Sequence, residues 1–487
     1  MKRAFALCLL LVLTHTLLAQ QWEVLFEENV GFYAGCVNDN NETFMVGHKG
    51  SEAYVVKILT DGTYSSSLFS EGEGQSCFTN ILELDGGVFL LTGFVPDSTS
   101  SFNRFWIAMM DNDMNILNST FLNRPDGYDE FGNSLACQDV DGTIIISTNE
   151  WKRTPTHNMC IGVLLRINRE CEILHVRYLY GEYPDPLQHY DNFEEKSLRV
   201  SPTTGELIAI GYGDGGCPAV SCFDYEFNLL RGYQFLDEEG HLLIRSAPCT
   251  DYWYDDGSYL YVSNQNDSVL HNKPHLLIAK ANLQARTFER VEVNRVDSLY
   301  YCAVYQSMAA ANDSTIFVAA NCRIGHWAAP CNMEIFLCDK NLEILGYKGF
   351  FHESDYWPLF VIATKDSGCI VVSRKVGENC RVKKFLREDF NPIPCLVKEV
   401  PKEQIGALAY PNPTSSILNI DISLMRQVDG EMRFAIADIY GRTHLNRIIR
   451  EEGNVLTADV SSLPSGTYTY QIFVDGKIIV CDKFIKK

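Results

Sequence analysis

Basic residues are scarce in this 487-residue sequence, which holds 41 lysines and arginines against 62 aspartates and glutamates and has a formal net charge of -21. From Ile405 onward the nine basic residues equal the nine acidic ones, so the excess negative charge lies on the part of the chain before it. A surface of that kind repels phosphate groups. The composition therefore argues against nucleic acid and against anionic membranes as partners.

Motifs of the common catalytic and metal sites are also absent. The sequence has no His-Glu-x-x-His, no Gly-x-Ser-x-Gly, no P-loop, no dinucleotide-binding fingerprint and no pair of Cys-x-x-Cys motifs. The stretch from Asp111 begins like a calcium-binding EF-hand, but Ile116 stands where that loop needs glycine and Leu122 where it needs glutamate. His271 and His275 could ligate a metal if a further ligand converged, although solvated loop histidines are the simpler interpretation. We predict no metal and no cofactor.

A long apolar run occurs at the amino terminus and nowhere after it. Lys2 and Arg3 precede an apolar stretch that ends at Leu18-Ala19-Gln20, which is the order of a secretory signal peptide. The stretch is about 15 residues long, whereas a membrane-spanning helix needs about 20, so cleavage is favoured over retention as an anchor. We predict a signal peptide over residues 1–20, no transmembrane segment, and a mature protein that is secreted or held on the outer cell surface.

The chain before Ala409 repeats one pattern, a tight polar turn followed by an apolar strand. It recurs at intervals of 45 to 63 residues, starting at Glu42, Gly87, Gly142, Gly205, Gly257, Ser314 and Gly368. One apolar strand precedes each start and two follow it, which makes four strands per repeat. Such repeats without helical periodicity predict an all-β fold, a seven-bladed β-propeller over residues 21–390. A β-solenoid or a pair of sandwiches is the alternative.

Two further expectations follow from the strand order. The segment "WEVLFEE" at Trp22 could pair into the last repeat and remove its open edge. Strands of a meander alternate in direction, so short turns such as "DVDG" share one face and long loops such as "NEWKRTPTHN" share the other. Binding residues concentrate on long loops, so we expect the binding site on that elaborated face. Residues 391–408 contain three prolines and are predicted to form a linker.

Cysteines are frequent, at 17 in the whole chain. A secreted location permits disulfides, and two pairs of cysteines flank single loops, so the candidate disulfides are Cys217 with Cys222, and Cys322 with Cys331. Fifteen cysteines lie between the predicted signal peptide and Ala409. That odd number leaves a thiol unpaired there unless it bonds Cys481 or another chain.

Aromatic and acidic residues cluster where the repeats are expected to begin. These candidate binding residues are Tyr128, Asp129, Glu130, Phe131, Tyr190, Asp191, Phe193, Tyr252, Trp253, Asp355, Tyr356 and Trp357. Aromatic rings beside carboxylates suit the faces and hydroxyl groups of sugars, or a basic protein surface. We therefore predict a site at the mouth of the central channel. The alternative is that the rings pack between neighbouring blades as a feature of the repeat.

The last module, residues 409–487, consists of short alternating strands separated by Gly, Pro and Asp turns, which predicts a small immunoglobulin-like antiparallel β-sandwich. Its distinctive residues are Pro411, Asn412, Pro413, Asp438, Gly441, Gly466, Tyr468, Lys483, Lys486 and Lys487. These motifs resemble the type A C-terminal sorting domain of the type IX secretion system of the Bacteroidetes. The resemblance implies a domain that directs its cargo across the outer membrane through that machinery and is then commonly removed. The propeller is similar, more loosely, to repeat arrays of undefined function in such cargo proteins.

Three functions remain open at this stage. We favour a secreted or surface-displayed propeller that binds a protein or a glycan and does no chemistry. The first alternative is a hydrolase or lyase that acts on glycans with carboxylates at the channel mouth, such as Asp129, Glu130 and Asp191. The second is a structural component of a surface layer.

Overall fold

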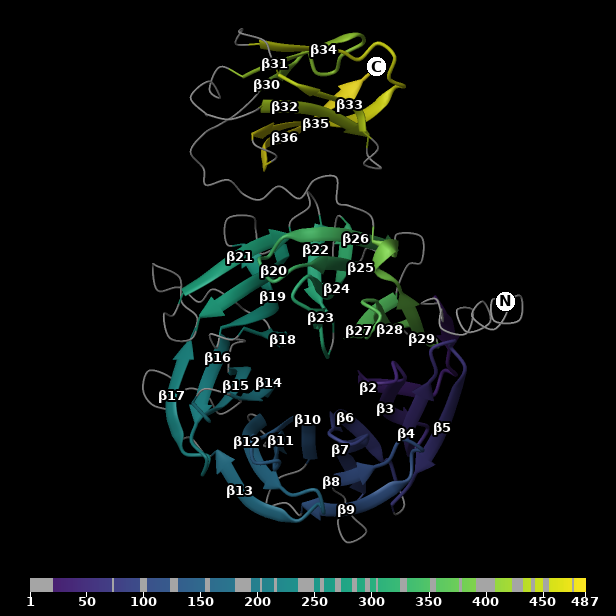
Figure 1. Cartoon of the computed structure of the whole chain (residues 1–487), viewed down its shortest axis with the longest axis vertical. Helices are drawn as coiled ribbons and strands as arrows, with labels where there is room; N and C mark the ends of the chain where they lie inside the picture. Colours follow the sequence, from purple (N-terminus) through teal and green to yellow (C-terminus); the bar gives the residue numbers. More distant parts are fainter. Residues whose placement is uncertain are drawn as a thin grey trace, which may run out of the picture. The chain divides into compact units, whose positions relative to one another are not determined.

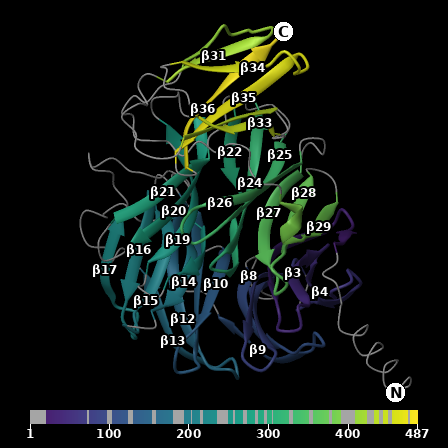
Figure 2. The ribbon, with the colours of Figure 1, turned by 45° about the horizontal axis from the view of Figure 1, so that its top comes forward.

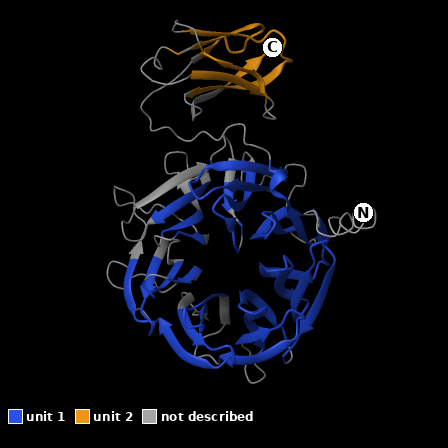
Figure 3. Ribbon diagram, in the orientation of Figure 1, with its two compact units in different colours: residues 1–391 blue, residues 392–487 orange. Residues whose placement is uncertain are grey.

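The structure of the protein is a computed structural model, and it divides into two compact units, unit 1 at residues 1–391 and unit 2 at residues 392–487 (Figure 3). The predicted signal peptide and nearly all of the predicted linker lie outside the residues that the structure describes. The described residues are 21–71, 74–96, 103–122, 130–153, 158–179, 194–201, 204–213, 217–234, 249–254, 258–267, 273–282, 287–293, 298–303, 305–324, 331–350, 356–375, 379–390, 408–422, 432–438, 443–449, 455–474 and 477–487.

Unit 1 consists of antiparallel sheets that lie around a common centre (Figure 1). Its described part also contains a short 3-10 helix, η2 (Arg387–Asp389). The sheets are numbered along the chain, and the strands of each are given from the innermost outward. Sheet 1 contains β2 (Val30–Val37), β3 (Thr43–Lys49), β4 (Glu52–Ile58) and β5 (Tyr64–Phe69). Sheet 2 contains β6 (Cys77–Leu84), β7 (Val88–Pro96), β8 (Asn103–Met110) and β9 (Ile116–Leu122). Sheet 3 contains β10 (Glu130–Gln138), β11 (Ile144–Arg153), β12 (Asn158–Ile167) and β13 (Ile173–Leu179).

Sheet 4 contains β14 (Glu194–Val200), β15 (Leu207–Gly213), β16 (Cys217–Phe223) and β17 (Leu229–Gln234). Sheet 5 contains β18 (Cys249–Trp253), β19 (Tyr259–Asp267), β20 (Lys273–Asn282) and β21 (Thr287–Val293). Sheet 6 contains β22 (Ser298–Cys302) and β23 (Met308–Asn312), then β24 (Thr315–Ile324), β25 (Cys331–Cys338) and β26 (Ile344–Phe350). Sheet 7 contains β27 (Tyr356–Ala363), β28 (Cys369–Lys375), β29 (Cys380–Phe385) and β1 (Glu23–Leu25).

The repeated turn of the sequence leads into the second strand of each sheet. The seven starts precede or begin β3, β7, β11, β15, β19, β24 and β28. At the turn before β11, Gly142 has a φ of +85°, which glycine adopts without strain. Asp141 Oδ1 accepts hydrogen bonds from the Thr143 N–H (2.9 Å) and hydroxyl (2.6 Å). An Asp-Gly pair therefore reverses the chain between an innermost strand and its neighbour.

A second repeated turn joins the third and fourth strands. In sheet 4, Asp224 Oδ1 accepts the N–H groups of Glu226 (2.9 Å) and Asn228 (2.8 Å), while Phe227 has a φ of +59° and a buried ring. A positive φ is uncommon for a residue with a side chain, and here burial of that side chain offsets its cost. The equivalent buried residues with positive φ in sheets 2, 3 and 6 are Met114, Cys171 and Leu342. The stretch from Asp111 is thus one of these turns.

The amino-terminal segment completes the last sheet. β1 pairs antiparallel with β29, with Glu23 opposite Lys383. Glu23 forms ion pairs with Arg381 (2.8 Å) and Lys383 (3.0 Å), and the Phe26 N–H donates to the Cys380 carbonyl (2.9 Å). The predicted pairing of "WEVLFEE" with the last repeat is confirmed. Sheet 7 is therefore built from both ends of unit 1.

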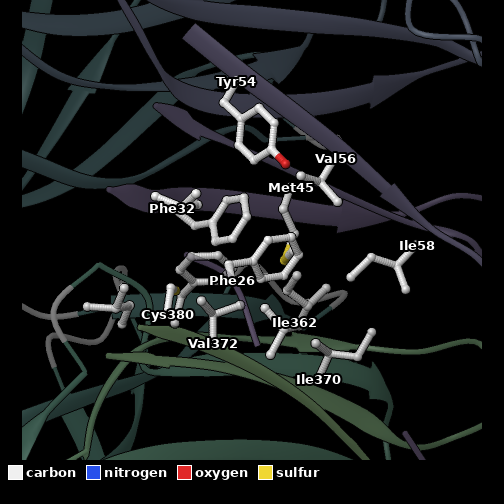
Figure 4. Close-up of a cluster of buried hydrophobic side chains, with 14 of the residues drawn as sticks. Phe26, Phe32, Met45, Tyr54, Val56, Ile58, Ile362, Ile370, Val372 and Cys380 are labelled. Atoms are coloured by element: carbon white, nitrogen blue, oxygen red, sulfur yellow. The ribbon is translucent and has the colours of Figure 1, made fainter. Parts of the chain in front are cut away.

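Apolar side chains fill the spaces between successive sheets. The cluster between sheets 1 and 7 contains Phe32 and Met45 from sheet 1 and Val372 and Cys380 from sheet 7, with Phe26 among them (Figure 4). Comparable clusters join sheets 1 and 2, 2 and 3, 3 and 4, 4 and 5, and 6 and 7. Because the sheets pack face to face, each innermost strand turns its unpaired edge towards the centre.

Unit 2 is a second all-β structure formed by two antiparallel sheets (Figure 2). Its core takes Leu418 and Leu456 from one sheet and Phe434 and Tyr470 from the other. No helix within the described residues of the chain is long and apolar enough to cross a membrane. The two sheets are β30 (Leu408–Tyr410), β31 (Ile417–Asp421) and β34 (Val455–Asp459), and β33 (Thr443–Ile448), β32 (Met432–Asp438), β35 (Gly466–Val474) and β36 (Lys477–Lys486).

Candidate functional site

The innermost strands of unit 1 surround a cavity of about 550 Å³. Residues of β2, β6, β10, β14, β18, β23 and β27 all line it. They come from the carboxyl-terminal parts of these strands, as Val37 does in β2, Trp253 in β18 and Ala363 in β27. The cavity therefore lies towards the short turns, whereas the sequence predicted a site on the elaborated face. Its volume falls within the range of small-molecule sites, roughly 300–1,000 Å³.

Sheet 6 departs from the regular ladder at its innermost edge. β22 and β23 both pair with β24, and the chain between them bonds to β27 of sheet 7. The Tyr305 N–H donates to the Leu359 carbonyl (2.8 Å), and the Val361 N–H donates to the Gln306 carbonyl (3.1 Å). This excursion places Tyr305 and Gln306 in the cavity wall. Local breaks in a ladder often re-aim side chains at a site.

Tyr305 belongs to an aromatic cluster. Its ring centroid lies 5.1 Å from that of Tyr33 in β2, and the Tyr33 ring lies 5.7 Å from the imidazole of His48 in β3. His48 packs on Gly31, where a Cβ would come within 2.5 Å of the imidazole. Burial raises the pKa of Tyr33, raises the pKa of Tyr305 to about 12 and lowers the pKa of His48. At neutral pH the cluster offers two phenol hydroxyls and a neutral imidazole for hydrogen bonding.

Glu83 brings a carboxyl group to the cavity from the end of β6. It is half-buried, and Asp39 in the first turn of sheet 1 is close enough for its charge to act on it. Burial, followed by the negative charge of Asp39, raises the pKa of Glu83, and the charge of Lys365 opposes this. Lys365 itself pairs with Asp39 (3.3 Å). A carboxyl group with a raised pKa holds its proton to higher pH, so it can donate a hydrogen bond as well as accept one.

Two thiols also line the cavity, at equivalent positions in their sheets. Cys36 and Cys137 are the next-to-last residues of β2 and β10. Burial raises the pKa of Cys36, and it raises the pKa of Cys137 to about 12. Because the thiolate is the reactive form, these side chains are poor nucleophiles at neutral pH.

Half of the predicted binding cluster lies outside the described residues. These residues are Tyr128, Asp129, Tyr190, Asp191, Phe193 and Asp355. For Glu130 and Phe131 the structure describes the main chain, which begins β10. The remaining four are aromatic residues of β18 and β27.

These four residues occupy opposite ends of their inner strands. β18 ends at Trp253, which pairs with Tyr259 at the start of β19, whereas β27 begins at Tyr356. Tyr252 and Trp253 therefore lie towards the short turns, and Trp253 lines the cavity. This differs from their predicted placement on the elaborated face: β18 pairs antiparallel with β19, so its last residues lie at the end of the sheet where β19 begins.

Arginine side chains cover three of these rings. The guanidinium of Arg381 lies 5.1 Å from the ring centroid of Tyr356. Arg323 of sheet 6 lies 5.1 Å from the ring of Trp357 in sheet 7, and Arg199 of sheet 4 lies 5.1 Å from that of Trp253 in sheet 5. The contacts of Arg323 with Trp357 and of Arg199 with Trp253 therefore cross from one sheet to the next. They agree with the alternative interpretation of the sequence, in which the aromatic rings pack between neighbouring repeats. Arg199 and Trp253 also line the cavity.

The two predicted disulfides stay predictions. Cys222 and Cys322 are buried on β16 and β24, whereas the side chains of Cys217 and Cys331 lie outside those that the structure describes. In the ladder of sheet 6, Cys322 stands opposite Asn332 and Cys331 stands opposite Arg323.

In unit 2, the Pro411-Asn412-Pro413 segment is attached to the lysine-rich end of the chain. The Asn412 amide donates to the Lys483 carbonyl (3.2 Å) and accepts from the Ile485 N–H (2.9 Å). The Thr414 N–H then donates to the Ile485 carbonyl (2.8 Å). The asparagine side chain thus takes the place of a neighbouring strand along the outer edge of β36. Two motifs at opposite ends of the module form one structural element.

The other motif residues of unit 2 support its second sheet. Gly466 begins β35 opposite Lys486, whose side chain is buried, whereas Lys483 and Lys487 are exposed. The Tyr468 hydroxyl donates to the Pro464 carbonyl (2.9 Å). Asp438 Oδ2 lies 3.1 Å from His444 Nε2. Gly441 lies outside the described residues.

Residues 408–487 match the family described as a secretion system C-terminal sorting domain. We call this part of unit 2 the sorting domain. A sorting domain of this kind implies export to the cell surface or to the outside of the cell. A comparison with curated proteins gives no match.

Solved structures similar to the chain share little sequence identity with it. The β-propeller domain of the Trilobed protease from Pyrococcus furiosus is 9% identical, with a TM-score of 0.38, and the match covers 71% of this chain and 88% of that one. The α-L-arabinofuranosidase from Fusarium graminearum is 10% identical, with a TM-score of 0.42, and the match covers 66% and 98%. No activity or ligand follows from such distant likenesses.

Proposed function

We propose that unit 1 is a seven-bladed β-propeller that binds a polar ligand of the size of a sugar in its central cavity and does no chemistry on it. The seven sheets around a common centre support the blade count. In the same proposal, residues 1–20 are a signal peptide, unit 2 is an immunoglobulin-like sandwich, and the type IX secretion machinery recognises the sorting domain. The functional molecule then acts at the cell surface or outside the cell.

The excursion of sheet 6 carries the proposal for the cavity. A regular innermost strand would pair with β24 continuously from β22 to β23. Instead, the pairing with β24 is interrupted between these strands, and Tyr305 and Gln306 lie in the wall of the cavity. An aromatic ring and an amide beside a carboxyl group suit the apolar face and the hydroxyl groups of a sugar. Glu83 and the stacked pair of Arg199 and Trp253 supply further polar and aromatic surface.

Binding is expected to depend on the two excursion residues. We expect saturation-transfer NMR with soluble mono- and disaccharides to identify ligands whose affinity falls about tenfold or more in Tyr305→Ala and in Gln306→Ala, which corresponds to about 1.4 kcal/mol or more. Tyr305→Phe, which keeps the ring, checks that a loss is not caused by unfolding. Tyr64→Ala, on the outer strand β5 with a side chain 50% exposed, is the matched control. Sugars that bind all four variants equally would place the site elsewhere.

One observation favours the hydrolase as a second candidate, namely the raised pKa of Glu83, since a general acid must hold its proton near neutral pH. For a binding protein, we expect no new reducing ends when the wild type is incubated with any oligosaccharide that it binds. If products do form, a rate that falls by about 100-fold or more in Glu83→Gln would assign the reaction to Glu83. The control is Asp85→Asn, which removes a carboxylate 89% exposed in the first turn of sheet 2 and should leave the rate unchanged.

A further inference from the structure

The wall of the cavity carries few charged side chains. Among the described residues that line it, only Glu83 and Arg199 are charged. They occupy equivalent positions, as the next-to-last residues of β6 and β14. Arg199 lies over the ring of Trp253, between sheets 4 and 5, whereas Glu83 belongs to sheet 2. The carboxyl group of Glu83 is therefore the acidic group that a ligand in the cavity meets.

Glu83 points to the side of sheet 1. Ile81, two residues before it in β6, belongs to the core between sheets 1 and 2, so the alternation of a strand turns Glu83 the same way. Cys36 of β2 packs against that core from the opposite sheet and also lines the cavity. The carboxyl group thus lies at the edge of the cavity between sheets 1 and 2, on the same side as a thiol that burial keeps neutral.

Glu83 forms no ion pair with any residue that the structure describes. Acidic residues in the first turns of sheets 1, 2 and 7 do pair: Asp39 with Lys365 (3.3 Å), Asp85 with Arg169 (3.7 Å) and Asp366 with Lys384 (2.5 Å). Burial and the charge of Asp39 raise the pKa of Glu83, although Lys365 acts in the opposite direction. A cation bound next to Glu83 would offset both effects, and the net charge of -21 attracts cations to the protein.

Glu83 and Tyr305 lie at different levels of the cavity. The ring centroid of Tyr305 is 5.1 Å from that of Tyr33, and Tyr33 precedes the lining residues of β2, which begin at Gly35. Tyr305 therefore lies on the side of the cavity away from the short turns. Glu83 is one residue from the end of β6 and lies next to a short turn. A ligand that fills the cavity can place a ring face on Tyr305 and a polar group at Glu83.

We propose that Glu83 binds a positively charged group of the ligand in the cavity, so that the ligand is an amino sugar with a free amine. The inference rests on the proposed function, which supplies the sugar. A hydrogen bond between an ammonium group and a carboxylate is about twice as strong as one between neutral groups. Salt and water screen a half-buried pair less than an exposed one. The amine of the ligand would take the part that lysine and arginine take for the acidic residues of the turns.

The experiment titrates the full mature chain with four probes at about pH 7 and follows binding by NMR. D-Glucosamine, D-glucose and N-acetyl-D-glucosamine differ at one position, which carries an ammonium group, a hydroxyl group or a neutral amide. Methylammonium tests the cation site without a sugar. At this pH an amine with an ordinary pKa of about 8 carries its charge. We expect D-glucosamine to bind about tenfold or more tightly than each of the other three probes.

Two variants test whether the preference comes from Glu83. Glu83→Gln keeps the shape of the side chain and removes its charge, so this variant should bind D-glucosamine no more tightly than D-glucose. Asp85→Asn removes an equal charge two residues further along, from a side chain 89% exposed, and should keep the preference of the wild type. Methyl signals as dispersed as those of the wild type show that both variants are folded.

The outcomes separate the two proposals. Equal binding of D-glucosamine and D-glucose overturns the ammonium site and leaves the sugar site standing. Methylammonium that binds as tightly as D-glucosamine, and only when Glu83 is present, supports the ammonium site and rejects the cavity as a sugar site. A preference for D-glucosamine that survives Glu83→Gln overturns the assignment to Glu83. Binding of none of the four probes overturns both proposals.

Discussion

Replacing Phe26 with alanine is expected to lower the free energy of unfolding of unit 1 by about 3–5 kcal/mol, the usual cost of removing a buried phenyl ring. Phe26 is 3% exposed, and its ring lies 5.0 Å from that of Phe32 and 5.1 Å from that of Tyr64. Figure 4 shows it between side chains of sheets 1 and 7. Because Phe26 belongs to the segment that completes sheet 7, its loss weakens the junction where the two ends of unit 1 meet. Urea unfolding followed by tryptophan fluorescence measures the change.

The neighbouring residue supplies the control for this prediction. Leu25 is 58% exposed on β1, so Leu25→Ala should change the free energy of unfolding by no more than about 0.5 kcal/mol. A Phe26 variant as stable as the Leu25 variant would mean that the amino-terminal segment does not hold the ring together. A large effect of both would point instead to the pairing of β1 itself, since alanine at Leu25 removes little buried surface.

The position of the strands could be predicted from the sequence because their signals are local. An Asp-Gly turn such as the one at Gly142 and an apolar stretch such as β11 can each be recognised within ten residues of sequence. Repetition then adds the strand order, and the open edge of the last repeat calls for "WEVLFEE". An apolar residue at the position of Phe227 recurs in several of the repeats. Its positive φ could not be predicted from the sequence, because that conformation is stabilised by a core that forms only when the sheets pack together.

The site could not be predicted in the same way, because it depends on contacts between sheets. The stretch "SLYYCAVYQSMAAAN" is longer than one strand, which hints at a break, yet nothing local says that Tyr305 bonds to Leu359 in the next sheet. The register of strand pairing cannot be read from the sequence either. A shift of one position in the ladder turns a side chain such as that of Cys322 to the other face of its sheet.

Replacing Arg166 with methionine is the second change with a large expected effect. Arg166 is 3% exposed in β12, and its guanidinium bonds Asp139 Oδ2 (2.5 Å) and Thr143 Oγ1 (2.8 Å) in the first turn of sheet 3. It also donates to the Tyr225 carbonyl (3.3 Å) and lies 3.8 Å from the Tyr225 ring centroid in sheet 4. Arg166→Met removes these contacts and leaves Asp139, itself 9% exposed, as an unpaired buried charge. We expect a loss of about 3–5 kcal/mol in the free energy of unfolding.

Two further variants show whether the loss comes from the unpaired charge. Arg169→Met removes an exposed arginine three residues away whose partner Asp85 is also exposed, at 3.7 Å, and should cost at most about 1 kcal/mol. Adding Asp139→Asn to Arg166→Met takes away the buried charge, so the double variant should be more stable than Arg166→Met alone, a coupling that a double-mutant cycle measures. If the loss of stability in the double variant equals the sum of the losses in Arg166→Met and Asp139→Asn, the two residues are not coupled. That result would show that the stacking on Tyr225, and not the ion pair, joins sheets 3 and 4. The distinction also bears on the cavity, because Gln138, next to Asp139, lines its wall.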